Sequence, residues 1–199
     1  MAKRALLLFV TLMLAGCAAA GVPAIDNPDV KLGQADYLMN GSGRIMQARR
    51  MTEQAMMTFE ERKDEAGLAR AYREYGLVAL AGGLRNDPII LRNPKVSFQP
   101  SPEDLQGAEI HLKHARELSA KTKQTDLVAN IDFVLGNMEM MRGNSPAACP
   151  YYDRAIQDFG EAKAQRPDAK FELPAGINDP VELVARAKKD AGCAPAQSG

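Results

Sequence analysis

A spacing of small and large residues in the second half of the chain constrains the fold more than any other feature. Counted from Gly136, the positions 7, 12, 16 and 19 residues further on hold Gly143, Ala148, Tyr152 and Ala155. Small residues let two helices approach closely, because the distance between helix axes depends on the side chains at their contact. The aromatic residue would fill the wedge between one hairpin and the next. The spacing therefore predicts an antiparallel helical hairpin.

A second, less regular copy of this pattern lies upstream. Its first helix is indicated by Tyr72, Tyr75, Gly76, Ala79 and Gly83. Its second helix is indicated by Ala108, Leu112 and Ala115, which keep the spacing of 4 and 3. Ala108 follows Gly83 by 25 residues, whereas Ala148 follows Gly143 by 5, so this copy carries a 20-residue insertion. A third, weaker echo consists of Ala48, Thr52 and Ala55.

The pattern resembles the tetratricopeptide repeat, a helical hairpin of about 34 residues that stacks into solenoids. The resemblance covers roughly residues 45–164, and both copies lack the usual tryptophan and the proline at the repeat end. It implies an all-α fold of about two repeats, with a flanking N-terminal helix and a C-terminal capping helix. Unrelated helical hairpins with alanine at their close contacts are the alternative.

Helix-favouring residues, caps and glycines divide the chain into six expected helices. They cover residues 35–62, 65–81, 101–121, 125–142, a segment from between 145 and 150 to 164, and 179–192. The first could break at residues 41–43. The folded domain is expected over residues 34–193, with an insertion loop at 84–102 and a disordered tail at 194–199.

The N-terminal residues have the three-part form of a secretory signal. Lys3 and Arg4 precede an apolar run over residues 5–14, broken only by Thr11, which is shorter than the roughly 20 residues of a membrane span. The sequence Leu-Ala-Gly-Cys at 14–17 resembles the lipobox of bacterial lipoproteins. This implies a signal peptide at 1–16, a lipidated Cys17 and a flexible tether over 17–33. Ala18, in place of Asp, favours the periplasmic face of the outer membrane.

Charge and cysteine content narrow the class of protein further. Without the signal the chain has 23 basic and 25 acidic residues and no basic stripe, so nucleic acid is not an expected partner. Cys149 and Cys193, 44 residues apart, are expected to form a disulfide in an oxidising compartment. Two separate thiols are the alternative.

The resemblance places a candidate partner-binding groove on the first helix of each repeat. The upstream repeat contributes Arg70, Arg73, Leu77 and Leu80, and the downstream repeat contributes Asn130, Phe133, Asn137, Met140 and Met141. This mixture suits a partly apolar protein or peptide segment with an acidic group near the arginines. Two arginines three apart on a helix could equally form a solvated face. The function expected is a lipid-anchored adaptor for an envelope assembly, such as a secretin, a secretion or pilus system, or cell-wall machinery.

Other chemistry is indicated more weakly. His111 and His114 with Glu117, or Met138 with Met140 and Met141, could hold zinc or copper, although exposed and core positions are the commoner roles. The insertion contains apolar residues that could cover the repeat or dock a protein, and self-association is a further alternative. These apolar residues are Ile89, Ile90, Leu91, Val96 and Phe98. No catalytic motif or phosphate-binding loop is recognisable, so we expect neither an enzyme nor a cofactor.

Overall fold

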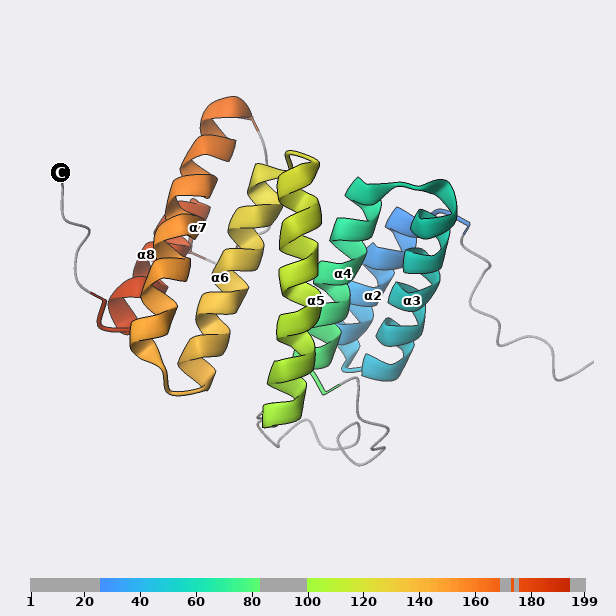
Figure 1. Ribbon diagram of the computed structural model, residues 1–199, viewed down its shortest axis with the longest axis horizontal. Helices are drawn as coiled ribbons and strands as arrows, with labels where there is room; N and C mark the ends of the chain where they lie inside the picture. Colours follow the sequence, from blue (N-terminus) through green and yellow to red (C-terminus); the bar gives the residue numbers. More distant parts are fainter. Residues whose placement is uncertain (1–25, 83–99, 169–172, 174–175, 194–199) are drawn as a thin grey trace, which may run out of the picture.

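The protein is all-helical over the residues that the computed structural model describes, which are 26–82, 100–168, 173 and 176–193. The described helices are α2 (Pro28–Ser42), α3 (Ile45–Arg62), α4 (Glu65–Leu80), α5 (Pro102–Lys121), α6 (Thr125–Met141), α7 (Ser145–Gln165) and α8 (Pro180–Asp190). Figure 1 shows them side by side in a single row of hairpins, with α8 beside α7 at one end.

The described helices pair as three antiparallel hairpins, α2 with α3, α4 with α5 and α6 with α7 (Figure 1). Contacts between α3 and α4, and between α5 and α6, join each hairpin to the next. The helix α8 packs on α7 and buries Val184 against Ala155 and Phe159. This confirms the predicted all-α hairpin fold with a C-terminal capping helix.

The N-terminal part of the fold differs from the prediction, because a complete hairpin stands where one flanking helix was expected. The tether boundary at residue 33 was wrong, since α2 begins at Pro28 and the Asn27 side chain caps it by accepting a hydrogen bond from the Asp29 amide. The helix ends at Gly43, whose φ of 63° is left-handed, and α3 follows at once. The predicted helix started only at residue 35, because the apolar residues of α2 face several directions: Ala35 is buried, whereas Val30 and Tyr37 are exposed.

The two predicted repeats are held by the same kind of contact. A Cβ atom on Gly76 of α4 would lie 2.7 Å from Cγ of Leu112 on α5, and one on Gly136 of α6 would lie 2.6 Å from Cε1 of Tyr152 on α7. Neither distance leaves room for a methyl group. Each glycine therefore lets a large side chain of the second helix lie against the backbone of the first.

The second helix of every hairpin repeats one pattern of buried residues. The three sets are Ala48, Thr52 and Ala55 on α3, Ala108, Leu112 and Ala115 on α5, and Ala148, Tyr152 and Ala155 on α7. No member of these sets is more than 1% exposed. The weak third echo in the sequence thus occupies the same structural position as the two clearer copies.

The helix ends follow the capping signals in the sequence. Ser101 and Asp104 form a reciprocal capping box at the start of α5, in which each side chain accepts a hydrogen bond from the other's backbone amide. Asp179 caps α8 through the Val181 amide. The helix α7 begins at Ser145 and continues through Pro150. These starts agree with the predicted ones.

A disulfide joins Cys149, in the first turns of α7, to Cys193, just after α8. The predicted pairing is therefore present, and it ties the capping helix to the last hairpin. Lys188 of α8 adds an ion pair to Asp153 of α7, with its Nζ 2.5 Å from Oδ1.

Several predicted features lie outside the described residues. They are the signal peptide, the lipidated Cys17, nearly all of the insertion loop 84–102 and the tail 194–199. Among the helices that are described, none combines the length and the apolar character that crossing a bilayer requires.

Replacing Gly136 by alanine is expected to destabilise the protein by about 1 to 3 kcal/mol, because the new methyl group must displace the Tyr152 ring. Gly160→Ala on the exposed side of α7 is the matched control, since its Cβ meets nothing within 4 Å and alanine favours a helix. Urea denaturation followed by circular dichroism measures both. Equal stabilities of the two variants would contradict the close contact.

Replacing Cys149 and Cys193 together by serine is expected to lower the free energy of unfolding. The chain-entropy model gives about 4 kcal/mol for closing a loop of this length. Denaturation of the oxidised wild type, the reduced wild type and the double variant measures the loss. An unchanged urea midpoint on reduction would show that the bridge contributes nothing to stability.

Candidate functional site

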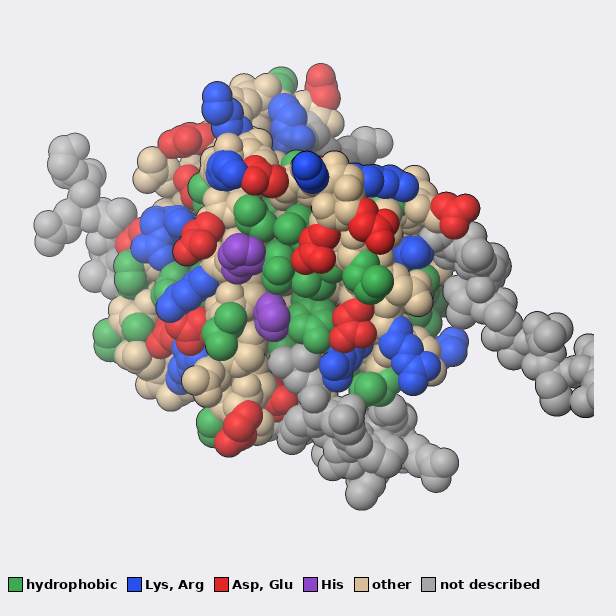
Figure 2. Space-filling view, turned by 45° about the vertical axis from the view of Figure 1, so that its right-hand side comes forward, with side chains coloured by type: hydrophobic (Ala, Val, Ile, Leu, Met, Phe, Trp, Pro, Cys, Tyr) green, Lys and Arg blue, Asp and Glu red, His purple; other side chains and the backbone are tan. Residues whose placement is uncertain are grey.

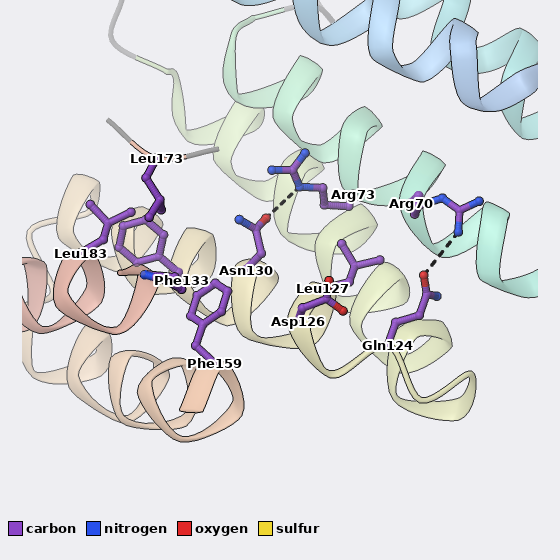
Figure 3. A pocket seen from close by; sticks show the side chains of 11 residues that line it. Arg70, Arg73, Gln124, Asp126, Leu127, Asn130, Phe133, Phe159, Leu173 and Leu183 are labelled. Carbon is purple, nitrogen blue, oxygen red and sulfur yellow. Dashed lines mark hydrogen bonds between the residues drawn. The ribbon is translucent and has the colours of Figure 1, made fainter. Parts of the chain in front are cut away.

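A cavity of about 340 Å³ is lined by residues of α4, α6, α7 and α8 (Figure 3). Its lining residues are Arg70, Arg73, Gln124, Asp126, Leu127, Asn130, Phe133, Phe159, Leu173, Pro180 and Leu183. They come from α4, from α6 with the turn before it, from α7 and from α8 with the segment before it. The second and third hairpins and the capping helix thus build one site.

The α4 end of the cavity carries two guanidinium groups. Arg73 donates from Nε to Oδ1 of Asn130 at 2.8 Å, and Arg70 donates from Nη1 to Oε1 of Gln124 at 3.4 Å (Figure 3). Arg70 also forms an ion pair with Asp29 of α2, at 2.7 Å. Both arginine side chains remain partly exposed, so their remaining N–H groups can reach a ligand.

The opposite end of the cavity is apolar. Figure 3 shows Phe133 lying between Leu173 and Leu183, with Phe159 next to it. The Phe133 ring also contacts the Tyr152 ring of the third hairpin, with 6.1 Å between centroids. The cavity is therefore amphipathic, with cationic donors at one end and aromatic and aliphatic side chains at the other.

Four of the predicted groove residues line this cavity: Arg70, Arg73, Asn130 and Phe133. The other five do not. On α4, Leu77 is half-buried further along the helix and Leu80 packs on the core. On α6, Asn137 accepts a hydrogen bond from the Tyr152 hydroxyl at 2.9 Å, Met140 packs against the third hairpin, and Met141 is exposed. The predicted stripe therefore extends beyond the cavity at its far end.

Seven lining residues were not predicted. Leu127 could have been found, because it lies three residues before Asn130 on the same face of α6. Phe159, Leu173 and Leu183 come from segments that no repeat pattern assigns to the groove. Asp126 is the acidic member of the lining, and the Arg166 guanidinium pairs with it at 2.8 Å.

A buried carboxylate, Glu74, lies next to the arginine end. It is 4% exposed, and its Oε2 lies 3.3 Å from Nη1 of Arg73, while its Oε1 has no hydrogen-bond partner among the described residues. Burial raises the pKa of Glu74 to about 7, although the Arg73 charge lowers it and the Asp36 carboxylate on α2 raises it further. A glutamate in a helix of mixed charge gives no sequence signal for such a position.

A second unpredicted group joins the second and third hairpins. The fully buried Asp132 carboxylate of α6 accepts two hydrogen bonds from Arg116 of α5, at 2.9 and 3.0 Å, and two longer ones from Arg154 of α7, both at 3.4 Å. Two cations thus balance the one buried anion. We assign this cluster to the stacking of the hairpins.

The two histidines lie against tyrosines. The His114 ring meets the Tyr72 ring edge-on at 4.4 Å, and the His111 ring meets the Tyr75 ring edge-on at 4.7 Å. Burial and the nearby His114 lower the pKa of His111. Among the described side chains, no three histidine, cysteine, aspartate or glutamate residues are grouped so that they could hold a metal ion. Figure 2 shows both histidines beside an apolar area.

Comparison of the chain with protein-family models, curated proteins and solved structures finds no match. The function is therefore inferred from the cavity and from the sequence patterns. Within the described residues, the amphipathic cavity is the feature best suited to bind another molecule.

Glu74→Gln is expected to change how stability depends on pH. The folded-state pKa of about 7 lies above the ordinary value of 4.5, so the wild-type carboxyl contributes most stability when protonated. That contribution is lost as the pH rises through 7, and it amounts to about 3 kcal/mol. Relative to the glutamine variant, the wild type should therefore lose stability between about pH 4.5 and 8.

Urea denaturation at several pH values measures this difference, with the exposed Glu61→Gln as control. Parallel stability curves for the wild type and Glu74→Gln would contradict the raised pKa.

Proposed function

We propose that this protein is a lipid-anchored periplasmic adaptor at the outer membrane. Its cavity holds an apolar side chain of a partner segment, and Arg70 and Arg73 hold an acidic group of the same segment. The observation that carries the proposal is the position of two partly exposed guanidinium groups next to a pocket lined by Phe133 and Leu183. The partner is a protein of an envelope assembly.

The arginine contacts suit reversible binding. Arg73 donates to the neutral amide of Asn130 and pairs with the buried Glu74. Arg70 donates to the neutral amide of Gln124 and to the Ala66 carbonyl, and pairs with the exposed Asp29. A ligand carboxylate can replace an amide with a bidentate pair of hydrogen bonds between opposite charges, which adds geometric specificity as well as energy. Exposed ion pairs such as Arg70–Asp29 contribute little, typically less than about 1 kcal/mol. Exchange of the two amide contacts and the Asp29 pair for a ligand therefore costs little.

The apolar end of the cavity would supply binding affinity for a partner segment over a small contact area. At about 340 Å³ the cavity accommodates one or two side chains and not a whole helix. Interfaces of this kind depend on a few buried anchors, and an aromatic or aliphatic anchor suits the surroundings of Phe133. The rest of the partner segment would then lie along the exposed parts of α4 and α6.

The membrane location in this proposal rests on the sequence. Residues 1–16 have the form of a signal peptide, and the residues at 14–17 resemble a lipobox ending in Cys17. The helical domain begins at Pro28, 11 residues after this cysteine. An extended chain spans at most about 3.6 Å per residue, so the domain would work within about 40 Å of the bilayer.

The test is in-cell crosslinking of the tagged, full-length protein, followed by affinity purification and mass spectrometry. The double variant Arg70→Glu with Phe133→Ala should lose at least about tenfold in recovery of an envelope partner, a loss equivalent to about 1.4 kcal/mol of binding. It reverses the charge at one end of the cavity and removes the apolar wall at the other.

The matched control is Arg62→Glu with Met57→Ala, because it makes the same change in charge and a similar truncation at exposed positions of α3. Circular dichroism checks that both double variants are folded. Full recovery of the partner with the cavity variant would reject the cavity as the binding site.

A further inference from the structure

The buried Glu74 carboxylate is connected to the cavity through one side chain. Its Oε2 contacts Nη1 of Arg73, and the Nε of the same guanidinium donates to Asn130 in the cavity wall. Its other oxygen, Oε1, is buried and has no hydrogen-bond partner in the part of the chain that the structure describes. Whether Glu74 carries a charge therefore decides how much of the Arg73 charge is balanced within the protein.

Few charged groups of the described residues act on this carboxylate. They are Arg73 on its own helix and Asp36 on α2, which have opposite effects on the pKa of Glu74. The helix α5 packs on the other side of α4, where Gly76 meets Leu112. On α3, Glu53 accepts hydrogen bonds from Arg49 and from the Tyr75 hydroxyl, so that ion pair is satisfied by other partners.

We propose that Glu74 is a proton-controlled regulator of the anion-binding end of the cavity, so that an acidic ligand binds more tightly when Glu74 is protonated. The proposal rests on the proposed function in one respect, namely that the ligand of the cavity is an anion beside Arg73. When Glu74 is ionised, its charge offsets that of Arg73 and repels a second carboxylate. When Glu74 takes up a proton at Oε1, the guanidinium charge is unopposed and available to the ligand.

The same coupling acts in reverse. Because binding free energies are reciprocally linked, an anion bound at Arg73 must favour the protonated form of Glu74 by the same factor. Binding of the ligand near neutral pH therefore takes up protons from solution. The pKa of Glu74, about 7, places this proton uptake in the neutral pH range.

The probe for the test is 8-anilinonaphthalene-1-sulfonate, whose fluorescence rises when it enters an apolar site. Its sulfonate stays ionised across the relevant pH range, so any change of affinity with pH comes from the protein. Wild-type affinity is expected to rise roughly tenfold from about pH 8.5 to about pH 5.5, within the usual range of coupling between two sites. Glu74→Gln should bind tightly at every pH, and Arg73→Gln weakly at every pH.

Three controls locate the effect. N-phenyl-1-naphthylamine, which lacks the sulfonate, should show no dependence on pH. The variant His111→Gln with His114→Gln should keep the wild-type pH dependence, because these residues lie against Tyr72 and Tyr75 and do not line the cavity. Phe133→Ala should weaken both probes.

The outcomes separate the two proposals. Suppose that Phe133→Ala weakens binding of the probe but that the wild type binds it equally well at every pH. This result would overturn the role of Glu74 and leave the cavity as a binding site. If neither Phe133→Ala nor Arg73→Gln changes the affinity for the probe, both the binding site and the role of Glu74 are overturned. The absence of saturable binding at the acidic end of the pH range would overturn both as well. A second readout is the ¹³C shift of the Glu74 carboxyl carbon, whose apparent pKa should rise when the sulfonate probe is bound and stay constant if the coupling is absent.

Discussion

The absence of side chains at Gly76 and Gly136 is the constraint on which the rest of the structure depends. At each position a large residue of the second helix, Leu112 or Tyr152, occupies the space that a Cβ atom would need. The alanines one turn before and after each large residue are fully buried, so the two helices of a hairpin lie close together along this face. This close packing fixes the angle at which the first helices present their other face, and that face carries Arg70, Arg73, Asn130 and Phe133.

The second and third hairpins carry different chemistry at equivalent positions of their first helices. Four residues before each glycine, the first helix carries Tyr72 in the second hairpin and Asp132 in the third. Tyr72 packs edge-on against His114, whereas Asp132 is bound by Arg116 and by Arg154. A buried carboxylate is tolerated only with its cations in place, so the second and third hairpins must stack in the register that supplies both. The cavity is lined by residues of both the second and the third hairpin, so the register of their stacking fixes the positions of its walls.

The sequence predicted the parts of the structure that depend on local spacing and capping. The second-helix alanines, the break within residues 41–43 and the start at Ser101 follow from such signals. Four of the cavity residues follow from the resemblance to the tetratricopeptide repeat. The start of α2, before residue 35, was missed because the apolar residues of this helix do not fall on one face.

The remaining cavity residues were missed for a different reason. Leu183 and Phe159 enter the cavity only through the packing of α7 and α8, and the disulfide between Cys149 and Cys193 helps to hold that packing. Glu74 and Asp132 were missed because a charged residue on a helix is ordinarily expected on the solvated face. Only the stacking of three hairpins encloses them.

The central claim, that the cavity between α4, α6 and α8 receives a partner, is tested most directly by site-specific photocrosslinking in cells. A photoreactive phenylalanine derivative at Leu127, in the cavity wall, is compared with one at Ile110, which is exposed on α5. The account predicts that one envelope protein is crosslinked from position 127 and not from position 110. Crosslinking of the same protein from position 110 alone would show that the partner binds the other side of the hairpin row, and would contradict the account.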